Sequence, residues 1–408
     1  MMAYIRRAAL LLCLLLVAVA TAPATTAAVA APSQAADLTA EAQYTVSSNQ
    51  SGFVKAHDGK FASVWRSSKD DTQTIDIKAG QDIQGIALNW DAPPEEWALL
   101  APDSSGNWQT LCTAEDRGMF HDYAAVPGAH DTVRLEIRND GGVALRELSV
   151  WGQGVLPESV QVWEPTARGV DLLVISAHPD DEVLFMGGTL PTYAGQRKLS
   201  TAVLIMAHSN RLRASEELDC LWTVGVRSYP VLNLFPDKLT ETLAQAEKAW
   251  GRDKTVDFIT EQIRMLRPKV IVTHDLKGEY GHGMHRLTAS ATLEAIEHAA
   301  DADQAPESAL KYGTWQVSKC YLHLYKENRV RMDWNVPLPA FGGKTALDIA
   351  KAGYDRHVSQ HKWAFKVTDQ GATNCADFGL AYTAVGPDKE GKDFFENIYP
   401  SWLMEFGR

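Results

Sequence analysis

The stretch "VDLLVISAHPDDEVLFMGG", residues 170–188, decides the fold of the larger part of this chain. It begins with a continuous apolar run, which is typical of a strand buried in a parallel sheet. The run ends at a histidine, and three consecutive acidic residues follow at the predicted start of a helix. One acidic residue is enough to cap a helix, whereas three carboxylates beside a histidine repel one another unless a cation is present. The stretch therefore predicts a cation-binding edge of a sheet, with a simple helix cap as the alternative.

Strands and helices alternate after this stretch. Apolar periodicity predicts strands at 170–177, 201–207 and 269–274, and helices near 183–195, 213–225, 241–266 and 285–300. This order indicates a Rossmann-like layered α/β domain with a mostly parallel sheet. In such sheets ligands bind beyond the carboxyl ends of the strands. The three predicted strands all end there in polar residues, namely His178, His208-Ser209-Asn210 and His274-Asp275.

The preceding residues, 37–155, follow a different pattern. Their short alternating apolar runs, separated by turn residues, predict an antiparallel all-β sandwich. Residues 156–167 contain two prolines and form the predicted linker, and the α/β domain then covers 168–408. Three tryptophans of the sandwich are either core residues, which is the more common case, or a sugar-binding surface: Trp65, Trp90 and Trp108.

Residues 1–36 have the composition of a signal peptide and leader. Arg6 and Arg7 precede an apolar run at 8–20, and Ala28-Val29-Ala30 offers a cleavage site. We therefore expect a secreted, extracellular protein, with an uncleaved N-terminal anchor as the alternative. No later run reaches the roughly 18 consecutive apolar residues that a membrane span needs.

The charge of the chain argues against nucleic acid as a main partner. The formal net charge is −12, and no basic stripe is visible in the sequence. Proteins that bind nucleic acids gather basic residues on one face. The substrate is therefore expected to be neutral or cationic.

Four cysteines follow the leader: Cys112, Cys220, Cys320 and Cys375. In an exported chain four cysteines can form two disulfides by three alternative pairings. We expect Cys320 to pair with Cys375. Cys220 lies in a predicted helix and is expected to pack as a small buried apolar side chain.

A second polar segment, "GEYGHGMHRLT" at 278–288, follows the strand predicted at 269–274. His282 and His285 are three residues apart, so they share a face if a helix begins there. An open site for a divalent ion that favours nitrogen and oxygen ligands, most simply Zn²⁺, needs three protein ligands. His178, Asp181 and His285 can supply them, and another divalent metal is the alternative.

Three motifs in this order resemble the LmbE/PIG-L family of zinc-dependent de-N-acetylases. They are "AHPDDE" at 177–182, "RASEELDCLWTVGV" at 213–226 and "HGMH" at 282–285. The likeness covers residues 168–300, and "FGLAYTAVGPDKEGKDFFENI" at 378–398 is similar to a late family segment, which takes the domain to residue 408. Residues 37–155 resemble discoidin-like (factor 5/8 C-type) galactose-binding domains through "DGKFASVWRSS" and "VRLEIRND…LRELSVWG".

The resemblance to the LmbE/PIG-L family implies a role for each residue of the first and last motifs. It implies His178, Asp181 and His285 as metal ligands. Asp180 would be the base that takes a proton from a metal-activated water. His282 would stabilise the oxyanion or protonate the departing amine.

The middle motif and the third acid of the first motif have less defined roles. Arg213 either contacts substrate hydroxyls or phosphate, or forms a salt bridge with Glu216. Glu182 is expected to be structural rather than catalytic.

Many family members have H-P-D-H as the last motif, whereas this chain has Gly283 and Met284 in the middle positions. The aspartate that can orient the first histidine is therefore missing. We expect Glu279 or Asp275 to orient His282 instead.

A further pair, His357 and His361, is expected on one helix within "GYDRHVSQHKW" at 353–363. At i and i+4 the two side chains share a face and form a candidate second metal site. No acidic residue has matching spacing, so surface or supporting histidines are the favoured interpretation.

These observations predict a secreted, zinc-dependent hydrolase that removes the N-acetyl group from an N-acetylhexosamine in a glycan or glycoconjugate, which the sandwich would hold. An amidase acting on another N-acyl amide would need the same site chemistry and would differ only in its pocket. Outside the enzymes, the alternative is an inactive sugar-binding protein. Asp180 and the complete ligand set argue against it, because binding alone needs no water-activating base.

Overall fold

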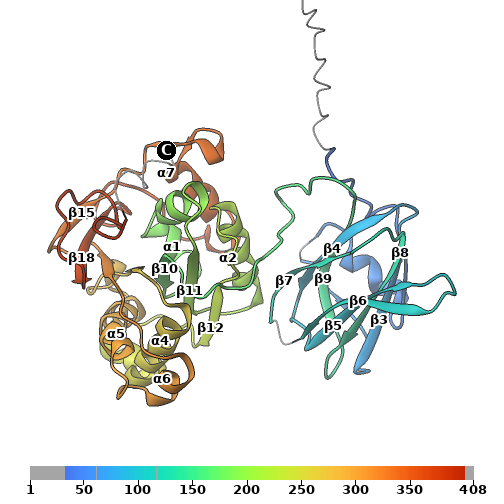
Figure 1. The fold of residues 1–408 in the computed structure, drawn as a ribbon, viewed down its shortest axis with the longest axis horizontal. Helices are drawn as coiled ribbons and strands as arrows, with labels where there is room; N and C mark the ends of the chain where they lie inside the picture. The colour runs from blue at the N-terminus through green and yellow to red at the C-terminus, as the bar shows by residue number, and fades with distance from the viewer. Residues whose placement is uncertain (1–32, 61, 116–117, 400–408) are drawn as a thin grey trace, which may run out of the picture. The chain divides into compact units, whose positions relative to one another are not determined.

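The computed structural model describes residues 33–60, 62–115 and 118–399 (Figure 1). Nearly all of the predicted signal peptide and leader at 1–36 lies outside the described residues, so cleavage and secretion stay predictions. Within the described part of the chain, no helix combines the length and the apolar character needed to cross a membrane.

The N-terminal region is all-β, as its alternating pattern predicts. One sheet has the strand order β1-β3-β8-β5-β6 and the other β2-β9-β4-β7, and the pairs are antiparallel. In β8 every second residue is buried, so one face of the strand builds the core. The strands are β1 Gln43–Val46, β2 Trp65–Arg66, β3 Thr72–Lys78, β4 Ile83–Trp90, β5 Glu96–Pro102, β6 Trp108–Glu115, β7 His121–Ala125, β8 Thr132–Arg138 and β9 Ala144–Gly152.

The three tryptophans of this region divide between core and surface. Trp65 and Trp90 are fully buried, so they are core residues. Trp108 is partly exposed, and the Arg134 guanidinium lies 4.2 Å from its ring centre. Of the three, only Trp108 presents a face that a ligand can reach.

The C-terminal region is a mixed sheet covered by helices (Figure 1). The strand order is β12-β11-β10-β13-β14-β18-β15. The pairs from β12 to β14 are parallel, and β18 is antiparallel to both of its neighbours. The strands are β10 Leu172–Ser176, β11 Thr201–Ala207, β12 Val231–Phe235, β13 Val270–Thr273, β14 Lys319–His323, β15 Arg329–Arg331 and β18 Asp377–Thr383. The helices are α1 Asp181–Leu184, α2 Arg211–Thr223, α3 Leu243–Trp250, α4 Arg252–Leu266, α5 Gly283–Ala300, α6 Pro306–Tyr312 and α7 Ala346–Tyr354.

Two predicted helices are each divided into shorter elements. The helix expected near 183–195 is the short α1 followed by a π-helical turn at Pro191–Gln196. Between them Gly187 has a left-handed φ of 51°, and a Cβ there would come within 2.5 Å of Cys375 Sγ. The helix expected at 241–266 is divided into α3 and α4 at Gly251, whose φ is 79°. Both breaks need a residue without a side chain.

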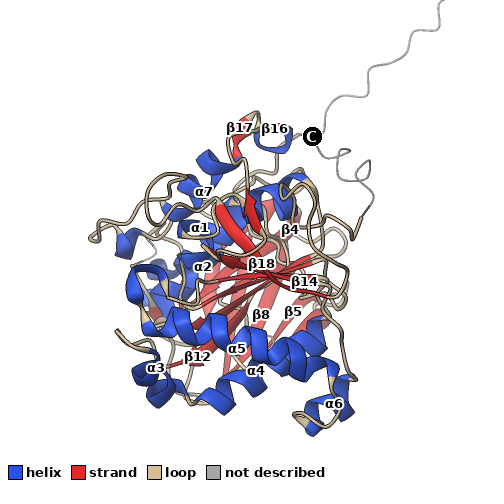
Figure 2. Ribbon diagram, turned by 90° about the vertical axis from the view of Figure 1, so that its left-hand side faces the viewer, coloured by secondary structure: helices blue, strands red, loops and turns tan. Residues whose placement is uncertain are grey.

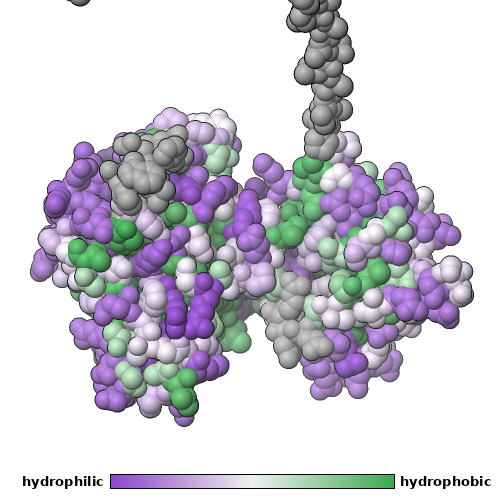
Figure 3. All heavy atoms as spheres, viewed as in Figure 1, coloured by the Kyte–Doolittle hydropathy of each residue, from purple (hydrophilic) through white to green (hydrophobic). Residues whose placement is uncertain are grey.

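Two apolar cores lie on opposite faces of this sheet. Because side chains alternate along β10, Leu172 and Val174 face one core, and Leu173 and Ile175 face the other. Helices α1, α2 and α7 cover the first face, and α3, α4 and α5 cover the second (Figure 1; Figure 2). The surface drawn in Figure 3 is mostly hydrophilic, in contrast to these cores.

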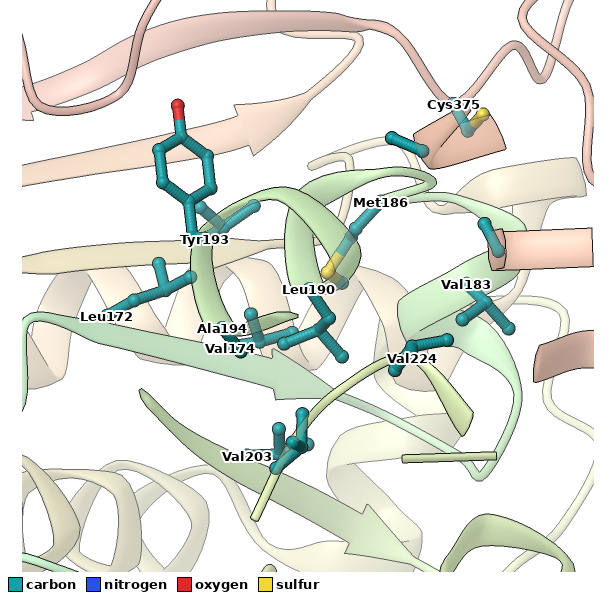
Figure 4. Close-up of a cluster of buried hydrophobic side chains, with 14 of the residues drawn as sticks. Leu172, Val174, Val183, Met186, Leu190, Tyr193, Ala194, Val203, Val224 and Cys375 are labelled. Atoms are coloured by element: carbon teal, nitrogen blue, oxygen red, sulfur yellow. The ribbon is translucent and has the colours of Figure 1, made fainter. Parts of the chain in front are cut away.

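The expected disulfide between Cys320 and Cys375 is not formed. No disulfide links any of the four cysteines of the described residues. Cys320 belongs to the core beneath α4 and α5, whereas Cys375 lies in the core on the other face, which Figure 4 shows. The sheet therefore separates the two sulfur atoms, and their Cβ atoms cannot approach to the distance that a disulfide needs. Cys220 is buried, as expected.

Candidate metal centre and active site

Three histidines of the candidate site come from the carboxyl ends of neighbouring strands. His178 follows β10, His274 follows β13, and His323 ends β14. These parallel strands are neighbours in the sheet, which brings the three side chains to one edge. The short 3-10 helix η3 (Glu279–Gly281) adds Glu279, and the first turn of α5 adds His285. All five side chains are buried.

The three predicted metal ligands meet through their donor atoms. His178 Nδ1 lies 3.2 Å from Asp181 Oδ2, His285 Nε2 lies 3.3 Å from the same oxygen, and the two nitrogens are 3.3 Å apart. Ligands about 2.0–2.1 Å from a tetrahedral zinc ion are roughly 3.3–3.4 Å from one another. The three donors therefore fit one face of such a site, and the fourth position remains for a ligand from outside the protein.

Opposite charges surround the ligand atoms. Burial alone would raise the pKa of Asp181, but His285 and His178 outweigh it and hold that pKa well below its usual range. Burial lowers the pKa of His285, and the carboxylates of Asp181 and Glu279 reverse this effect and raise the pKa to about 10. Since a buried carboxylate that stays ionised requires a compensating positive charge, the triad favours a cation.

Glu279 accepts hydrogen bonds from three buried histidines. Its Oε2 lies 2.8 Å from Nδ1 of both His274 and His285, and its Oε1 lies 2.7 Å from Nδ1 of His323. A carboxylate that holds Nδ1 of a histidine fixes the ring and leaves Nε2 free for a metal. Glu279 therefore orients His285, whereas the sequence led us to expect that it orients His282.

His274 and His323 support the site without being available as ligands. The N–H of Ala177 donates to Nε2 of His274 at 2.8 Å, and Nε2 of His323 lies 2.8 Å from the carbonyl oxygen of Asn374. The sequence motifs do not predict His323. The one signal for it is its position at the end of the apolar segment "KCYLH".

His282 caps the N-terminus of α5. Its Nδ1 accepts a hydrogen bond of 3.3 Å from the N–H of Met284, so the proton of the neutral ring lies on Nε2. The ring centre is 4.9 Å from that of His178 and 4.7 Å from that of His285. Burial and these two neighbouring histidines lower the pKa of His282 to about 3. A backbone contact thus takes the place of the carboxylate that we expected to orient this ring.

Asp180 adopts a backbone conformation that is rare for a residue with a side chain. Its φ is 99°, and such a conformation costs about 1–3 kcal/mol outside glycine. The buried carboxylate lies 3.5 Å from the guanidinium of Arg213, which also donates to the carbonyl of Pro179. Burial raises the pKa of Asp180 well above its usual value; Arg213 opposes the rise, and Asp181 and Glu182 add to it. The surrounding contacts therefore hold Asp180 in a strained backbone conformation, a feature that clusters at functional sites.

Arg213 pairs with the predicted base rather than with Glu216. Glu216 instead accepts hydrogen bonds from the N–H and the hydroxyl of Ser359, at 2.7 and 2.6 Å. Among the polar residues after β11, Asn210 caps α2 by accepting from the N–H of Arg213. Direct contact of Arg213 with substrate stays a prediction.

His357 and His361 do not lie on one helix. Both follow the end of α7, and the 3-10 turn η5 (Val358–Gln360) separates them. His361 is exposed, whereas His357 is fully buried near the carboxylates of Glu182 and Glu217. No acidic residue has matching spacing in the sequence, and the carboxylates near His357 come from distant segments.

Substituting Glu279→Gln should weaken metal binding at the triad. The amide nitrogen of glutamine would face at least one of the three ring N–H groups and the negative charge would be lost, so the network that orients His285 would be weakened. Loss of a supporting carboxylate lowers metal affinity by about 10–100-fold, which competition with a chelator would measure. Glu294→Gln is the matched control, since Glu294 lies on α5 with a 36% exposed side chain and pairs with Arg252. Equal zinc affinity of both variants would contradict the role of Glu279.

Residues 173–296, which run from β10 into α5, match the family model "PIG-L: GlcNAc-PI de-N-acetylase". The curated relatives include a 1D-myo-inositol 2-acetamido-2-deoxy-alpha-D-glucopyranoside deacetylase 1 of Frankia casuarinae. It is 31% identical over 179 residues, which are 37% of this chain and 57% of the relative. A deacetylase of Rhodococcus erythropolis is 27% identical over 274 residues, 54% of this chain and 89% of the relative. The chain thus spans a little more than half the length of the Frankia relatives that it matches.

Solved structures are similar to separate parts of the chain. Chitosan-binding module 1 of a chitosanase/glucanase from Paenibacillus sp. IK-5 is 25% identical and covers 29% of this chain and 99% of the module, with a TM-score of 0.26. A conserved protein of Thermus thermophilus is 22% identical and covers 47% of this chain and 80% of its own, with a TM-score of 0.33. Scores at this level leave function open, and the discoidin-like character of residues 37–155 stays a prediction. It is the segment around the candidate metal centre, residues 173–296, that resembles the PIG-L de-N-acetylases.

Proposed function

We propose that the chain is a secreted, metal-dependent hydrolase, with Zn²⁺ as the metal, that removes the N-acetyl group from an N-acetylhexosamine in a glycan or glycoconjugate. The observation that carries this proposal is the triad of donor atoms 3.2–3.3 Å apart beside the buried, strained Asp180. The match of residues 173–296 to GlcNAc-PI de-N-acetylases supports the reaction class. The deacetylase relatives support an N-acetylglucosamine-type substrate.

Each residue of the site has one task in amide hydrolysis. His178, Asp181 and His285 would hold a divalent ion, which when bound would supply Lewis acidity that makes water acidic near neutral pH and polarises the acetyl carbonyl. Asp180 takes the proton of the attacking water, a task that suits a buried carboxylate with a raised pKa. Arg213, 3.5 Å away, keeps this carboxylate in place.

His282 stabilises the oxyanion that forms on the acetyl carbonyl. Because its Nδ1 accepts from the N–H of Met284, its Nε2–H is the donor that remains. The proton collected by Asp180 passes to the amine nitrogen as the C–N bond breaks, and the products are acetic acid and the amine, which are present as acetate and ammonium at neutral pH. This assignment favours the oxyanion role of His282 over proton donation to the amine.

Exposed aromatic side chains next to the triad favour a sugar ring as the substrate. Tyr280 is 53% exposed, and its ring centre lies 5.4 Å from that of His285 and 5.1 Å from that of Phe365. Its φ of 45° is another strained backbone conformation beside the site. An aromatic face can bury the apolar C–H face of a sugar while the hydroxyl groups stay hydrated. We assign Tyr280 and Phe365 to binding of the hexosamine.

Acetate release by the purified chain, with and without a chelator, tests the proposed reaction. The substrates would be 1D-myo-inositol 2-acetamido-2-deoxy-alpha-D-glucopyranoside and oligosaccharides of N-acetylglucosamine and N-acetylgalactosamine. We expect acetate from at least one of them, lost on chelation and restored by Zn²⁺, because the triad must be loaded for water activation. Acetate from other N-acyl amides alone would indicate the amidase, and sugar binding without acetate would indicate a binding protein.

Asp180→Asn should abolish turnover and leave the metal bound. Loss of a general base lowers kcat by about 10²–10⁴-fold, whereas the ligand triad is unchanged. The adjacent Asp181→Asn is the matched control and should lose both the metal of the triad and activity. Metal analysis and acetate release on the same samples would separate the two roles. Metal loss in Asp180→Asn with metal retained in Asp181→Asn would mean that the two aspartates are assigned in the wrong order.

Tyr280→Ala should raise KM and leave kcat nearly unchanged. An aromatic contact worth about 0.5–1.5 kcal/mol corresponds to a roughly two- to ten-fold change, and Tyr280→Phe should preserve it. Tyr312→Ala is the control, since Tyr312 lies on α6, which precedes the amino end of β14, whereas the candidate site lies at the carboxyl ends of the strands. A fall in kcat at constant KM would show instead that Tyr280 supports the neighbouring histidines.

A further inference from the structure

A second group of metal-binding side chains lies next to the first, and the proposed reaction does not use it. One donor atom of each of Glu182, Cys220 and His357 lies within 4.8 Å of the other two, and all three residues are fully buried. Glu182 belongs to the first turn of α1, Cys220 lies on α2, and His357 follows α7. Three segments far apart in the sequence thus meet through polar side chains where an apolar contact would be usual.

Glu217 is a further carboxylate beside this group of three donors, next to His357. It is three residues before Cys220 on α2, so the two share a face of the helix. His357 Nε2 lies 3.7 Å from Glu217 Oε2 and 4.0 Å from Glu182 Oε1, and Cys220 Sγ lies 3.2 Å from Glu182 Oε1. Neighbouring nitrogen, oxygen and sulfur ligands of a tetrahedral zinc ion are roughly 3.3–3.6 Å apart. Movement of the His357 ring and of the Glu217 carboxylate toward Glu182 and Cys220 would complete such a set.

Buried polar atoms of the cluster lack hydrogen bonds. Within the part of the chain that the structure describes, this holds for both carboxylate oxygens of Glu217 and both ring nitrogens of His357. An unsatisfied buried polar atom costs about 1–3 kcal/mol, and more if it is charged. Native proteins satisfy nearly all such atoms, so several unsatisfied atoms beside one group of donors indicate a missing ligand.

Burial favours the neutral forms of these groups, so a cation beside them would be needed to stabilise ionised ligands. Burial raises the pKa of Glu217 well above its usual value, and neighbouring carboxylates add to the rise. Burial and Glu182 likewise raise the pKa of the Cys220 thiol. Burial lowers the pKa of His357 well below its usual value, which keeps the ring in the neutral form that binds metals. Two carboxylates and a thiolate around a dication leave one negative charge, and Arg213 lies near enough to lower the pKa of Glu217.

We propose that Glu182, Glu217, Cys220 and His357 hold a second metal ion, a buried Zn²⁺ with four protein ligands. One thiolate, one imidazole and two carboxylates form a donor set that zinc accepts. Four protein ligands leave no position for water, so this ion is structural. It ties α1 and α2 to the segment after α7 and supports the turn that carries the catalytic aspartate. The site stands independently of the deacetylase reaction.

Cobalt(II) in place of zinc tests the site, because the catalytic triad contains no sulfur ligand. The full chain would be expressed in cobalt-supplemented medium, and its metal content and near-ultraviolet absorption measured. We expect two metal equivalents per chain and a thiolate-to-cobalt charge-transfer band. The Cys220→Ser variant should lose the charge-transfer band and the metal equivalent of the second site. The Asp181→Asn variant should lose the metal equivalent of the triad and keep the charge-transfer band.

Cys320→Ser is the matched control, since Cys320 is equally buried but belongs to the core on the other face of the sheet. It should keep both equivalents and the band. A single equivalent without the band in the unsubstituted chain, or a band that survives Cys220→Ser, would overturn the proposal. If Cys220→Ser does not fold, His357→Gln keeps the thiol, and an unchanged spectrum of that variant would also overturn it. Two metal equivalents and the charge-transfer band without acetate release would refute the proposed deacetylase reaction and leave the second metal site supported.

Discussion

The buried carboxylate of Glu279 is the interaction on which the candidate site depends. It joins η3 to β13, β14 and α5 by accepting hydrogen bonds from His274, His323 and His285. Burial would raise its pKa, but His274 and these hydrogen bonds hold the pKa well below its usual range. An uncompensated buried charge costs several kcal/mol, whereas three charge-assisted hydrogen bonds compensate it. The direction of the His285 ring is therefore fixed by a group that does not itself belong to the ligand triad.

Local sequence patterns predict the α/β sheet well where apolar periodicity is strong. The strand expected at 201–207 is β11 with the same bounds, and the helix expected at 285–300 is α5, which begins two residues earlier at Gly283. The patterns fail where a backbone break is set by packing. Gly187 and Gly251 interrupt continuous apolar periodicity because of their left-handed φ values, which periodicity does not register.

The residues of the site were predictable to the extent that they lie at strand ends and helix starts. His178 and His274 follow directly from strand positions, since parallel strands share one binding edge. Three other features were not predictable from the sequence. They are the role of Glu279, the buried partners of His357 and the separation of Cys320 from Cys375. Each of these depends on which distant elements become neighbours and on which face of the sheet a side chain emerges, and spacing in the sequence contains neither.

The three consecutive acids of the motif have three different partners. Successive side chains at the start of a helix point about 100° apart, so they cannot converge on one ion. Asp180 faces Arg213, Asp181 faces the ligand histidines, and Glu182 faces Cys220. A single cation shared by all three carboxylates, which the sequence alone suggests, is therefore too simple. Asp180 and Asp181 each have their own compensating group. Glu182 instead faces a thiol, a neutral imidazole and a further carboxylate, which supply no positive charge of their own.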